Sequence, residues 1–247
     1  MKTIVITGAS SGIGYATAKA LATGNRLILC GRRTERLQQL QKELTGTPTF
    51  LLTFDVAKKE EVFTAFHSLP ETWQKIDVLI NNAGNAHGLA RFQDADLTDL
   101  DAMIDSNVKG VIYVTKACLP YLQQSENAHI INLSSIAGKQ VYTNGTTYCA
   151  SKWAVEALTK GMRLDFLPLG IKVTSVAPGA VETEFSLVRF KGDEQLADNV
   201  YNGYMPLKAE DIAETIAFAV NQPANVQLAD ITVLPKAQAD GITFLKE

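Results

Sequence analysis

The sequence has few residues of the kinds that build disulfide frameworks or metal sites. Its 247 residues include only three cysteines and three histidines, which are scattered without CxxC or HExxH spacing. It has no run of about 18 apolar residues, the length of a membrane span. The N-terminus enters a strand-like run at once, with no cleavable leader. We therefore expect no bound metal, no membrane association, and reduced thiols in an unprocessed, cytoplasmic protein.

The chain also lacks the excess of positive charge typical of proteins that bind nucleic acid. Its formal net charge is −3 and its isoelectric point is about 5.7, so we expect no nucleic-acid partner. The length fits one domain, and its core is large enough to be stable without disulfide bonds or a structural metal ion. No linker rich in glycine, proline or serine divides residues 1–247, so we expect a single domain.

Short apolar, β-branched runs alternate with helical patterns along the chain. This alternation predicts an α/β fold with a doubly wound parallel sheet of about seven strands and helices on both faces. The predicted strands are Thr3–Thr7, Arg26–Cys30, Thr49–Thr53, Val78–Ile80, His129–Leu133, Lys172–Val176 and Ile231–Leu234. The predicted helices are Tyr15–Ala22, Glu35–Leu44, Glu60–Ser68, Leu97–Leu122, Ser151–Leu167 and Glu210–Val220.

A glycine-rich loop follows the first predicted strand and opens the first helix. Gly8 allows a tight turn, Gly12 lets the backbone approach a pyrophosphate, and Gly14 permits close packing of the helix. The positive end of that helix attracts phosphate. The pattern predicts a dinucleotide site, rather than incidental glycines at a helix start, that includes Gly8, Ser10, Ser11, Gly12, Ile13 and Gly14.

Two arginines, Arg32 and Arg33, follow the second predicted strand. An NAD site usually has an acidic residue there, to accept hydrogen bonds from the ribose. The two guanidinium groups, with no carboxylate adjacent in the sequence, instead predict a clamp on the 2′-phosphate of NADP. The alternative is a solvated pair that begins the next helix.

Further candidates for the cofactor site follow the third and fourth strands, because open α/β sheets bind ligands at the carboxyl ends of their strands. The Asp55 carboxylate is a candidate acceptor for the adenine amino group. Small residues after the fourth strand leave room for the adenosine. These candidates are Asp55, Val56, Asn82, Ala83 and Gly84.

Tyr148 and Lys152 are four residues apart, so they share one face of a helix. A free phenol has a pKa near 10 and is a poor base at neutral pH. A nearby ammonium group favours the phenolate. This pair alone does not separate a catalytic dyad from an amphipathic helix surface.

Together with Thr7–Gly14, Asn81–Gly84, Ser134-Ser135 and Asn107, the Tyr148–Lys152 run resembles the short-chain dehydrogenase/reductase family across nearly the whole chain. The resemblance implies that Tyr148 exchanges the proton and that Lys152 binds the nicotinamide ribose and lowers the pKa of Tyr148. It implies that Ser135, rather than Ser134, contacts the reacting oxygen and that Asn107 supports a water relay. Structural alternatives are a turn cap for Ser135 and a helix-bending hydrogen bond for Asn107.

The segment after the sixth strand resembles the family's nicotinamide-side segment and substrate lid. It supplies the candidates Pro178, Gly179, Val181 and Thr183, and we expect a lid near residues 184–205. The run that follows resembles NADP-dependent 3-hydroxy acid dehydrogenases, which act on serine and allo-threonine. Arg189 and Lys191 are candidate cations for a carboxylate or, equally, solvated charges of the lid.

Three functions remain open at this level. The first is NADP-dependent hydride transfer between nicotinamide and a small 3-hydroxy acid, or the matching carbonyl compound. The second is a broad carbonyl reductase or a reductase of 3-oxoacyl thioesters, whose acidic carrier protein the low isoelectric point disfavours. The third is a non-catalytic NADP sensor, which the presence of Tyr148 and Lys152 disfavours.

Two of the predicted helices, Leu97–Leu122 and Ser151–Leu167, have more apolar residues than are needed to pack one face of a helix against a sheet. Relatives in the family usually pair these helices across a two-fold axis, so we expect a homo-oligomer, a tetramer rather than a dimer. The alternative is a purely internal core. The residues concerned are Val111, Ile112, Val114, Trp153, Val155 and Leu158.

Overall fold

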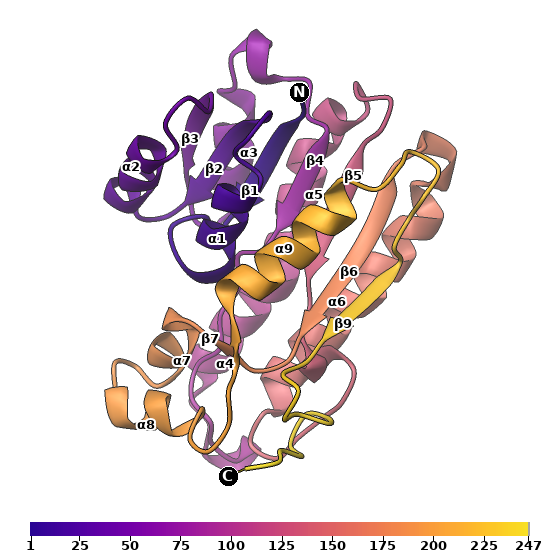
Figure 1. The fold of residues 1–247 in the computed structure, drawn as a ribbon. Helices are drawn as coiled ribbons and strands as arrows, with labels where there is room; N and C mark the ends of the chain where they lie inside the picture. Colours follow the sequence, from indigo (N-terminus) through magenta and orange to yellow (C-terminus); the bar gives the residue numbers. More distant parts are fainter. Residues whose placement is uncertain (247) are drawn as a thin grey trace.

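A computed structural model describes residues 1–246, and one parallel sheet of seven strands forms its centre (Figure 1). The strand order β3-β2-β1-β4-β5-β6-β9 reverses direction between β1 and β4, which is where doubly wound sheets form their ligand crevice. This confirms the predicted fold class. The strands are β1 (Thr3–Thr7), β2 (Arg26–Gly31), β3 (Thr49–Thr53), β4 (Val78–Asn81), β5 (His129–Leu133), β6 (Lys172–Pro178) and β9 (Asp230–Val233).

Helices cover both faces of this sheet (Figure 1). Side chains of β1 alternate between them: Ile4 and Ile6 enter one apolar cluster and Val5 the other, as the two-residue period of a strand requires. On the first face lie α1 (Gly12–Ala20), α2 (Thr34–Glu43) and α9 (Ala209–Val220). On the second lie α3 (Lys59–His67), α5 (Gly110–Leu122) and α6 (Thr146–Asp165).

Two predicted helices differ most from the observed ones, and the bounds of the other four are within three residues of the prediction. The helix expected over Leu97–Leu122 is α4 (Leu97–Ile104) and α5, joined by a π-helical turn at Asp105–Lys109. Helix α6 begins five residues before the predicted Ser151, directly after Gly145. A Cβ atom on Gly145 would lie 2.1 Å from the Tyr142 ring, so only glycine fits at the residue directly before the helix.

A smaller unit, which the apolar pattern did not predict, stands beyond the carboxyl ends of the strands. Strands β7 (Val181–Glu182) and β8 (Leu207–Lys208) pair in parallel. Between them the chain forms α7 (Glu184–Arg189) and α8 (Glu194–Asn199), which lie away from both helix layers (Figure 1).

Five of the six residues that we expected to help bury an exposed apolar face are buried or half-buried within the chain itself. Val111, Val114 and Val155 are buried within the chain, and Ile112 and Leu158 are half-buried. Trp153 alone among the six is exposed. Across residues 1–246 we find no helix with the length and apolar character to span a membrane.

Candidate active site

A cleft of about 630 Å³ runs along the carboxyl ends of the strands. It brings together nearly all of the predicted site residues, from the glycine loop to Tyr148. The exceptions are Gly14 and Asn107, which lie outside its lining. The predicted residues that line it are Gly8, Ser10, Ser11, Gly12, Ile13, Arg32, Arg33, Asp55, Val56, Asn82, Ala83, Gly84, Ser135, Tyr148, Lys152, Pro178, Gly179, Val181 and Thr183.

The glycine loop occupies one end of the cleft, at the start of α1. Gly8 and Gly12 have φ angles of 67° and 53°, a region in which a side chain is strained. Gly14 lies behind the loop, and a Cβ atom there would come within 2.4 Å of the Gly8 carbonyl oxygen. Gly14 therefore permits close packing, as predicted, while the first two glycines shape the turn.

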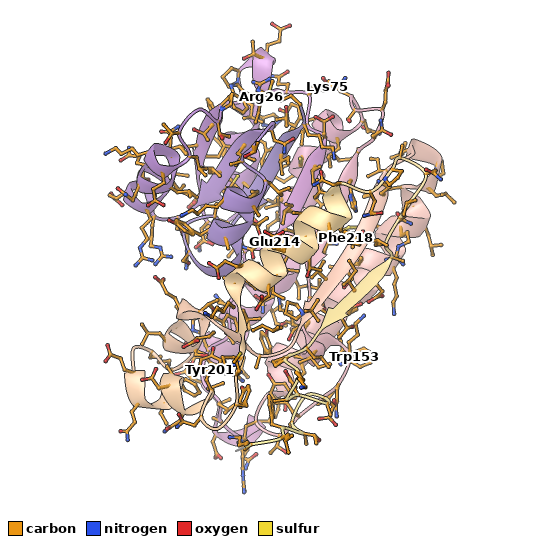
Figure 2. All side chains as sticks on the ribbon, in the orientation of Figure 1. Arg26, Lys75, Trp153, Tyr201, Glu214 and Phe218 are labelled. Atoms are coloured by element: carbon orange, nitrogen blue, oxygen red, sulfur yellow. The ribbon has the colours of Figure 1, made fainter. Side chains whose placement is uncertain are left out.

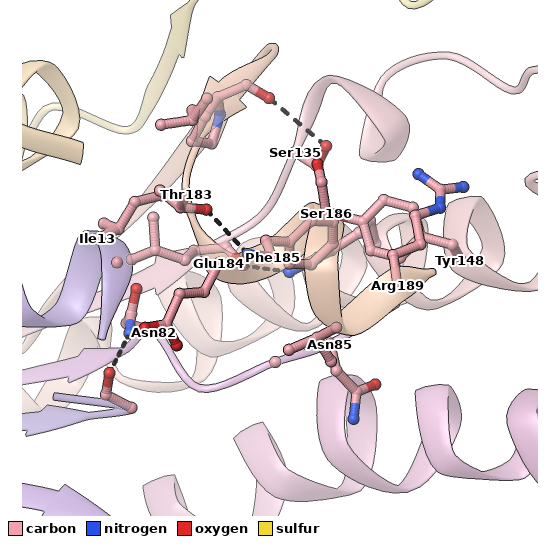
Figure 3. A pocket seen from close by; sticks show the side chains of 18 of the residues that line it. Ile13, Asn82, Asn85, Ser135, Tyr148, Thr183, Glu184, Phe185, Ser186 and Arg189 are labelled. Atoms are coloured by element: carbon pink, nitrogen blue, oxygen red, sulfur yellow. Dashed lines mark hydrogen bonds between the residues drawn. The ribbon is translucent and has the colours of Figure 1, made fainter. Parts of the chain in front are cut away.

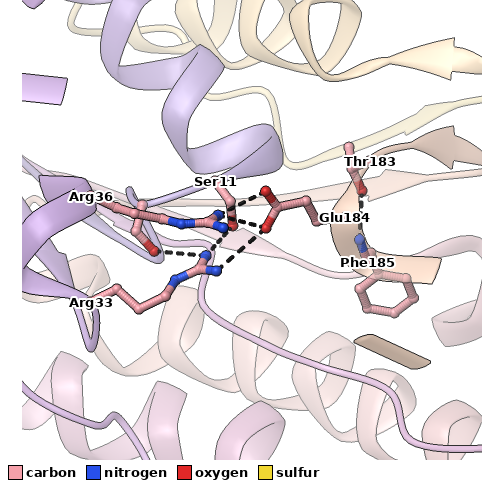
Figure 4. Close-up of polar contacts among 7 residues, drawn as sticks. Ser11, Arg33, Arg36, Thr183, Glu184 and Phe185 are labelled. Carbon is pink, nitrogen blue, oxygen red and sulfur yellow. Dashed lines mark hydrogen bonds and ion pairs between the residues drawn. The ribbon is translucent and has the colours of Figure 1, made fainter. Parts of the chain in front are cut away.

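The arginines beyond β2 have carboxylate neighbours, contrary to the expectation from their surroundings in the sequence. Arg32 lies 3.6 Å from Asp55, and Arg33 lies 3.4 Å from Glu184 of α7. Arg33 also donates to the Ser11 and Ser10 hydroxyl groups at 2.9 and 3.2 Å (Figure 4). The fold, rather than local sequence, supplies these acidic partners.

Arg36 lies beside the cleft, and the sequence analysis did not single it out. It lies in the first turn of α2 and contacts both carboxylate oxygens of Glu184, at 2.7 and 2.8 Å (Figure 4). The sequence separation of these two residues is 148, so no local pattern could have linked them.

Tyr148 lies in the first turns of α6, with its ring toward the cleft (Figure 3). The Phe185 ring centre is 5.8 Å from the Tyr148 ring centre, and the Arg189 guanidinium carbon is 5.6 Å from it. Burial raises the pKa of Tyr148 above its ordinary value, and a hydrogen bond with Ser135 opposes that effect. The chain's own groups therefore raise this pKa, whereas the family resemblance implied a lowered one.

Lys152 lies one helical turn beyond Tyr148 and is buried. Its Nζ atom donates to the Leu133 carbonyl oxygen at 2.9 Å and lies 5.9 Å from the centre of the Tyr148 ring. Burial lowers the pKa of Lys152 to about 8, against the opposing effect of the Glu156 carboxylate. The ammonium group is thus held beside the phenol and is easily deprotonated.

Ser135 takes part both in a turn and in the cleft. Its Oγ accepts a hydrogen bond from the Ala137 amide at 3.1 Å, which caps a short 3₁₀ helix. The same hydroxyl group donates to the Pro178 carbonyl oxygen at 3.5 Å (Figure 3). Ser135 also lowers the pKa of Tyr148, and both Ser134 and Ser135 line the cleft, so the choice between them stays a prediction.

Asn107 lies behind the cleft in the π-helical turn. Its Nδ2 atom donates to the Asn85 carbonyl oxygen at 2.8 Å and to the Ser151 hydroxyl group at 3.0 Å. Its Oδ1 atom accepts from the Asn85 amide at 2.8 Å. These contacts join the loop after β4 to α6, next to Lys152.

The two candidate cations of the lid differ in position. Arg189 lines the cleft and its Nε donates to the Gly88 carbonyl oxygen at 3.1 Å. Lys191 is exposed and pairs with Asp99 at 2.8 Å, so its charge already has a partner. Tyr142, which the sequence analysis also missed, lines the cleft with Arg189.

The chain is similar to known proteins over nearly its whole length. The model of the family described as short chain dehydrogenase matches residues 2–193. An NADP-dependent 3-hydroxy acid dehydrogenase of Schizosaccharomyces pombe is 43% identical over 96% of this chain and 93% of its own length. Sulfoacetaldehyde reductase 2 of Chromohalobacter salexigens is 42% identical over 96% and 95%.

Solved structures show the same likeness. The closed form of serine dehydrogenase complexed with NADP⁺ superposes with a TM-score of 0.93 at 35% identity, over 99% of each chain.

Proposed function

Because the chain belongs to the short-chain dehydrogenase family, we propose that it is an NADP(H)-dependent oxidoreductase acting on small 3-hydroxy acids. The same reaction in reverse reduces the matching oxo acids or aldehydes. The names of its relatives support both the cofactor and the substrate class. The cleft supplies the residue types that this chemistry needs.

The residues of the cleft fit a dinucleotide with a 2′-phosphate. The glycine loop opens α1 with two glycines in the left-handed region, as close approach to a pyrophosphate requires. Arg32 and Arg33 lie beside this loop and would hold the 2′-phosphate by charge-assisted hydrogen bonds. When bound, the cofactor supplies the nicotinamide carbon that accepts or donates the hydride.

Tyr148, Ser135 and Lys152 would handle the proton and the negative charge on the substrate oxygen. In the oxidative direction the phenolate of Tyr148 would take the proton from the hydroxyl oxygen, while the carbon that bears this oxygen gives up its hydrogen as hydride. The Ser135 hydroxyl group stabilises charge on that oxygen by hydrogen bonding. The Lys152 ammonium group favours the phenolate, while Asn107 holds the loop that faces Lys152.

The position of Arg189 is the observation that carries the choice of an acidic substrate. Its guanidinium carbon lies 5.6 Å from the centre of the Tyr148 ring, inside the cleft. A carboxylate or sulfonate on the substrate would find a cation there, while its hydroxyl group reaches Tyr148. A sulfonate aldehyde is the second candidate, supported by the reductase from Chromohalobacter.

A substrate panel tests this assignment. NADP⁺ reduction is measured with serine, allo-threonine and 3-hydroxybutyrate beside neutral secondary alcohols, and NADPH oxidation with sulfoacetaldehyde. We expect kcat/KM for the anionic compounds to exceed that for neutral alcohols by at least tenfold. Activity confined to neutral alcohols would instead support a broad carbonyl reductase, and no turnover with any compound would support a sensor.

We also propose a homotetramer, with a dimer as the alternative, in the cytoplasm. Trp153 of α6 and Phe218 of α9 are 47% and 61% exposed and extend from the helix layers (Figure 2). Large exposed apolar side chains support contact between copies of the chain. The free thiols of Cys30, Cys118 and Cys149 support a reducing compartment. Light scattering on the purified protein measures the assembly.

A further inference from the structure

Helix α7 joins the two ends of the cleft. Its first residue, Glu184, contacts Arg33 and Arg36 beside the glycine loop (Figure 4). Its last residue, Arg189, lies over the Tyr148 ring at the opposite end. Because α7 has only six residues, a contact that holds Glu184 also restricts Arg189, which in addition bonds to Gly88.

Arg36 holds Glu184 more closely than Arg33 does. One Arg36 nitrogen lies within 2.8 Å of both carboxylate oxygens, whereas the Arg33 contact measures 3.4 Å. The other terminal nitrogen of Arg33 donates to Ser10 and Ser11 on the glycine loop. The two arginines therefore have different main partners. Arg36 binds Glu184 of the lid, and Arg33 binds the glycine loop, where the phosphates of the cofactor are expected.

The carboxylate is ionised in this position. Partial burial raises the pKa of Glu184, but hydrogen bonding and charge from Arg36, and then from Arg33, leave it below its ordinary value. An unpaired carboxylate here would repel the 2′-phosphate that Arg33 is proposed to bind. Arg36 neutralises that charge.

The Arg36–Glu184 ion pair contributes more to the position of α7 than to the free energy of unfolding. The side chains of Arg36 and Glu184 are 47% and 45% exposed, and such surface pairs stabilise a fold weakly. They nevertheless connect α2 to the first residue of α7, while the other end of that helix is held by hydrogen bonds between Arg189 and Gly88. The free energy of one surface ion pair is small beside that of the whole fold, but it is sufficient to shift the position that one short helix prefers.

We propose that Arg36 and Glu184 form a latch that holds α7 across the bound dinucleotide and sets Arg189 beside Tyr148. Both are positioning residues, and neither touches the reacting atoms. This inference rests on the proposed function for its kinetic readout only. The position of α7 can be measured without turnover.

Trypsin reports that position, because it cleaves after Arg189 and Lys191. With saturating NADP⁺, we expect Arg36→Gln and Glu184→Gln each to speed cleavage at these sites by about twofold to fivefold, the range of a surface ion pair. The double variant should match the faster single variant, because both changes break one contact. Arg36→Lys keeps the charge and should retain most of the protection.

Kinetics supply the second readout. Both Gln variants should raise KM for 3-hydroxybutyrate by a similar factor, with kcat and the KM for a neutral alcohol nearly unchanged. Lys19→Gln is the matched control, because it breaks an exposed ion pair with Glu43 away from the cleft. This control should change neither readout.

Three results would overturn the latch: cleavage unchanged in both Gln variants, effects that add in the double variant, or equal acceleration in Lys19→Gln. If no hydroxy acid is oxidised but cleavage follows the expected pattern, the proposed substrate fails and the latch stands. If acids are oxidised normally and cleavage is unchanged, the latch fails and the proposed function stands.

Discussion

Gly84 and Asn107 approach so closely that no side chain fits between them. A Cβ atom on Gly84 would lie 2.9 Å from the Asn107 Oδ1 atom and 3.6 Å from the Lys152 Nζ atom. We expect Gly84→Ala to displace the amide and lower kcat by about tenfold or more, because small misplacements at a catalytic centre are costly.

Gly161→Ala is the matched control for this change. A Cβ atom on Gly161, in the middle of α6, meets nothing within 4 Å. That variant should keep full activity and gain about 0.5–1 kcal/mol of stability from better helix propensity. Thermal unfolding and steady-state rates on both variants measure the difference. Equal activity in both would mean that the spacing around Asn107 is unimportant for turnover.

Tyr148→Phe should remove nearly all turnover while NADPH binding stays within about twofold, because the change deletes only the acid–base hydroxyl group. A loss of about 10²–10⁴-fold in kcat is typical for a general acid or base. Stopped-flow rates and a fluorescence titration with NADPH separate the two effects. Normal turnover would assign the proton transfer to another group.

Arg32→Ala combined with Arg33→Ala should weaken NADPH binding by about tenfold to a hundredfold, the value of one or two charge-assisted hydrogen bonds. NADH lacks the 2′-phosphate, so its Kd should barely change. Parallel titrations with the two cofactors measure the ratio. Equal losses for both would place the 2′-phosphate elsewhere.

Glu156 should tune the pH dependence through Lys152. This buried carboxylate lies one turn beyond Lys152 and accepts hydrogen bonds from Ser175 and Lys139 at 2.7 and 2.8 Å. Its charge raises the pKa of Lys152, which burial holds at about 8. In Glu156→Gln that pKa falls, so the ammonium form is lost at lower pH.

Carbonyl reduction by NADPH requires protonated Tyr148 and Lys152, so the alkaline limb of kcat/KM should move to lower pH in this variant. The limb belongs to the coupled Tyr148–Lys152 pair rather than to either residue. Asp230→Asn is the control, because Asp230 pairs with Lys139 and not with Lys152. A profile for Glu156→Gln that superposes on that of the unaltered protein contradicts the assignment.

Local sequence was sufficient to predict the seven-stranded sheet and the first residue of six of its strands. The apolar runs mark β1, β3 and β5 at their observed bounds, because buried strands need continuous apolar residues. The π-helical turn at Asn107 escaped prediction, since its one-residue widening leaves no periodic signal. The π-turn nonetheless carries a predicted site residue.

Contacts between distant segments were the part of the site that the sequence could not provide. In the sequence, Arg36 is indistinguishable from any exposed helix residue. Its contact with Glu184 exists only because the fold brings these two distant residues together. Similarly, Asp55 becomes a partner of Arg32 only when β2 and β3 lie side by side. Motifs identified the candidates for proton transfer and cofactor binding, whereas the residues proposed to align them could be found only from the fold.

The two-rung ladder of β7 and β8 has an evolutionary consequence. Because its rungs tie Val181 to Leu207 and Glu182 to Lys208, the intervening stretch enters and leaves the body of the protein at one place. Insertions, deletions and new side chains between these anchor points leave the seven-stranded sheet undisturbed. We therefore expect descendants of this chain to change substrate by altering this one segment, while Ser135, Tyr148 and Lys152, which lie outside it, are retained.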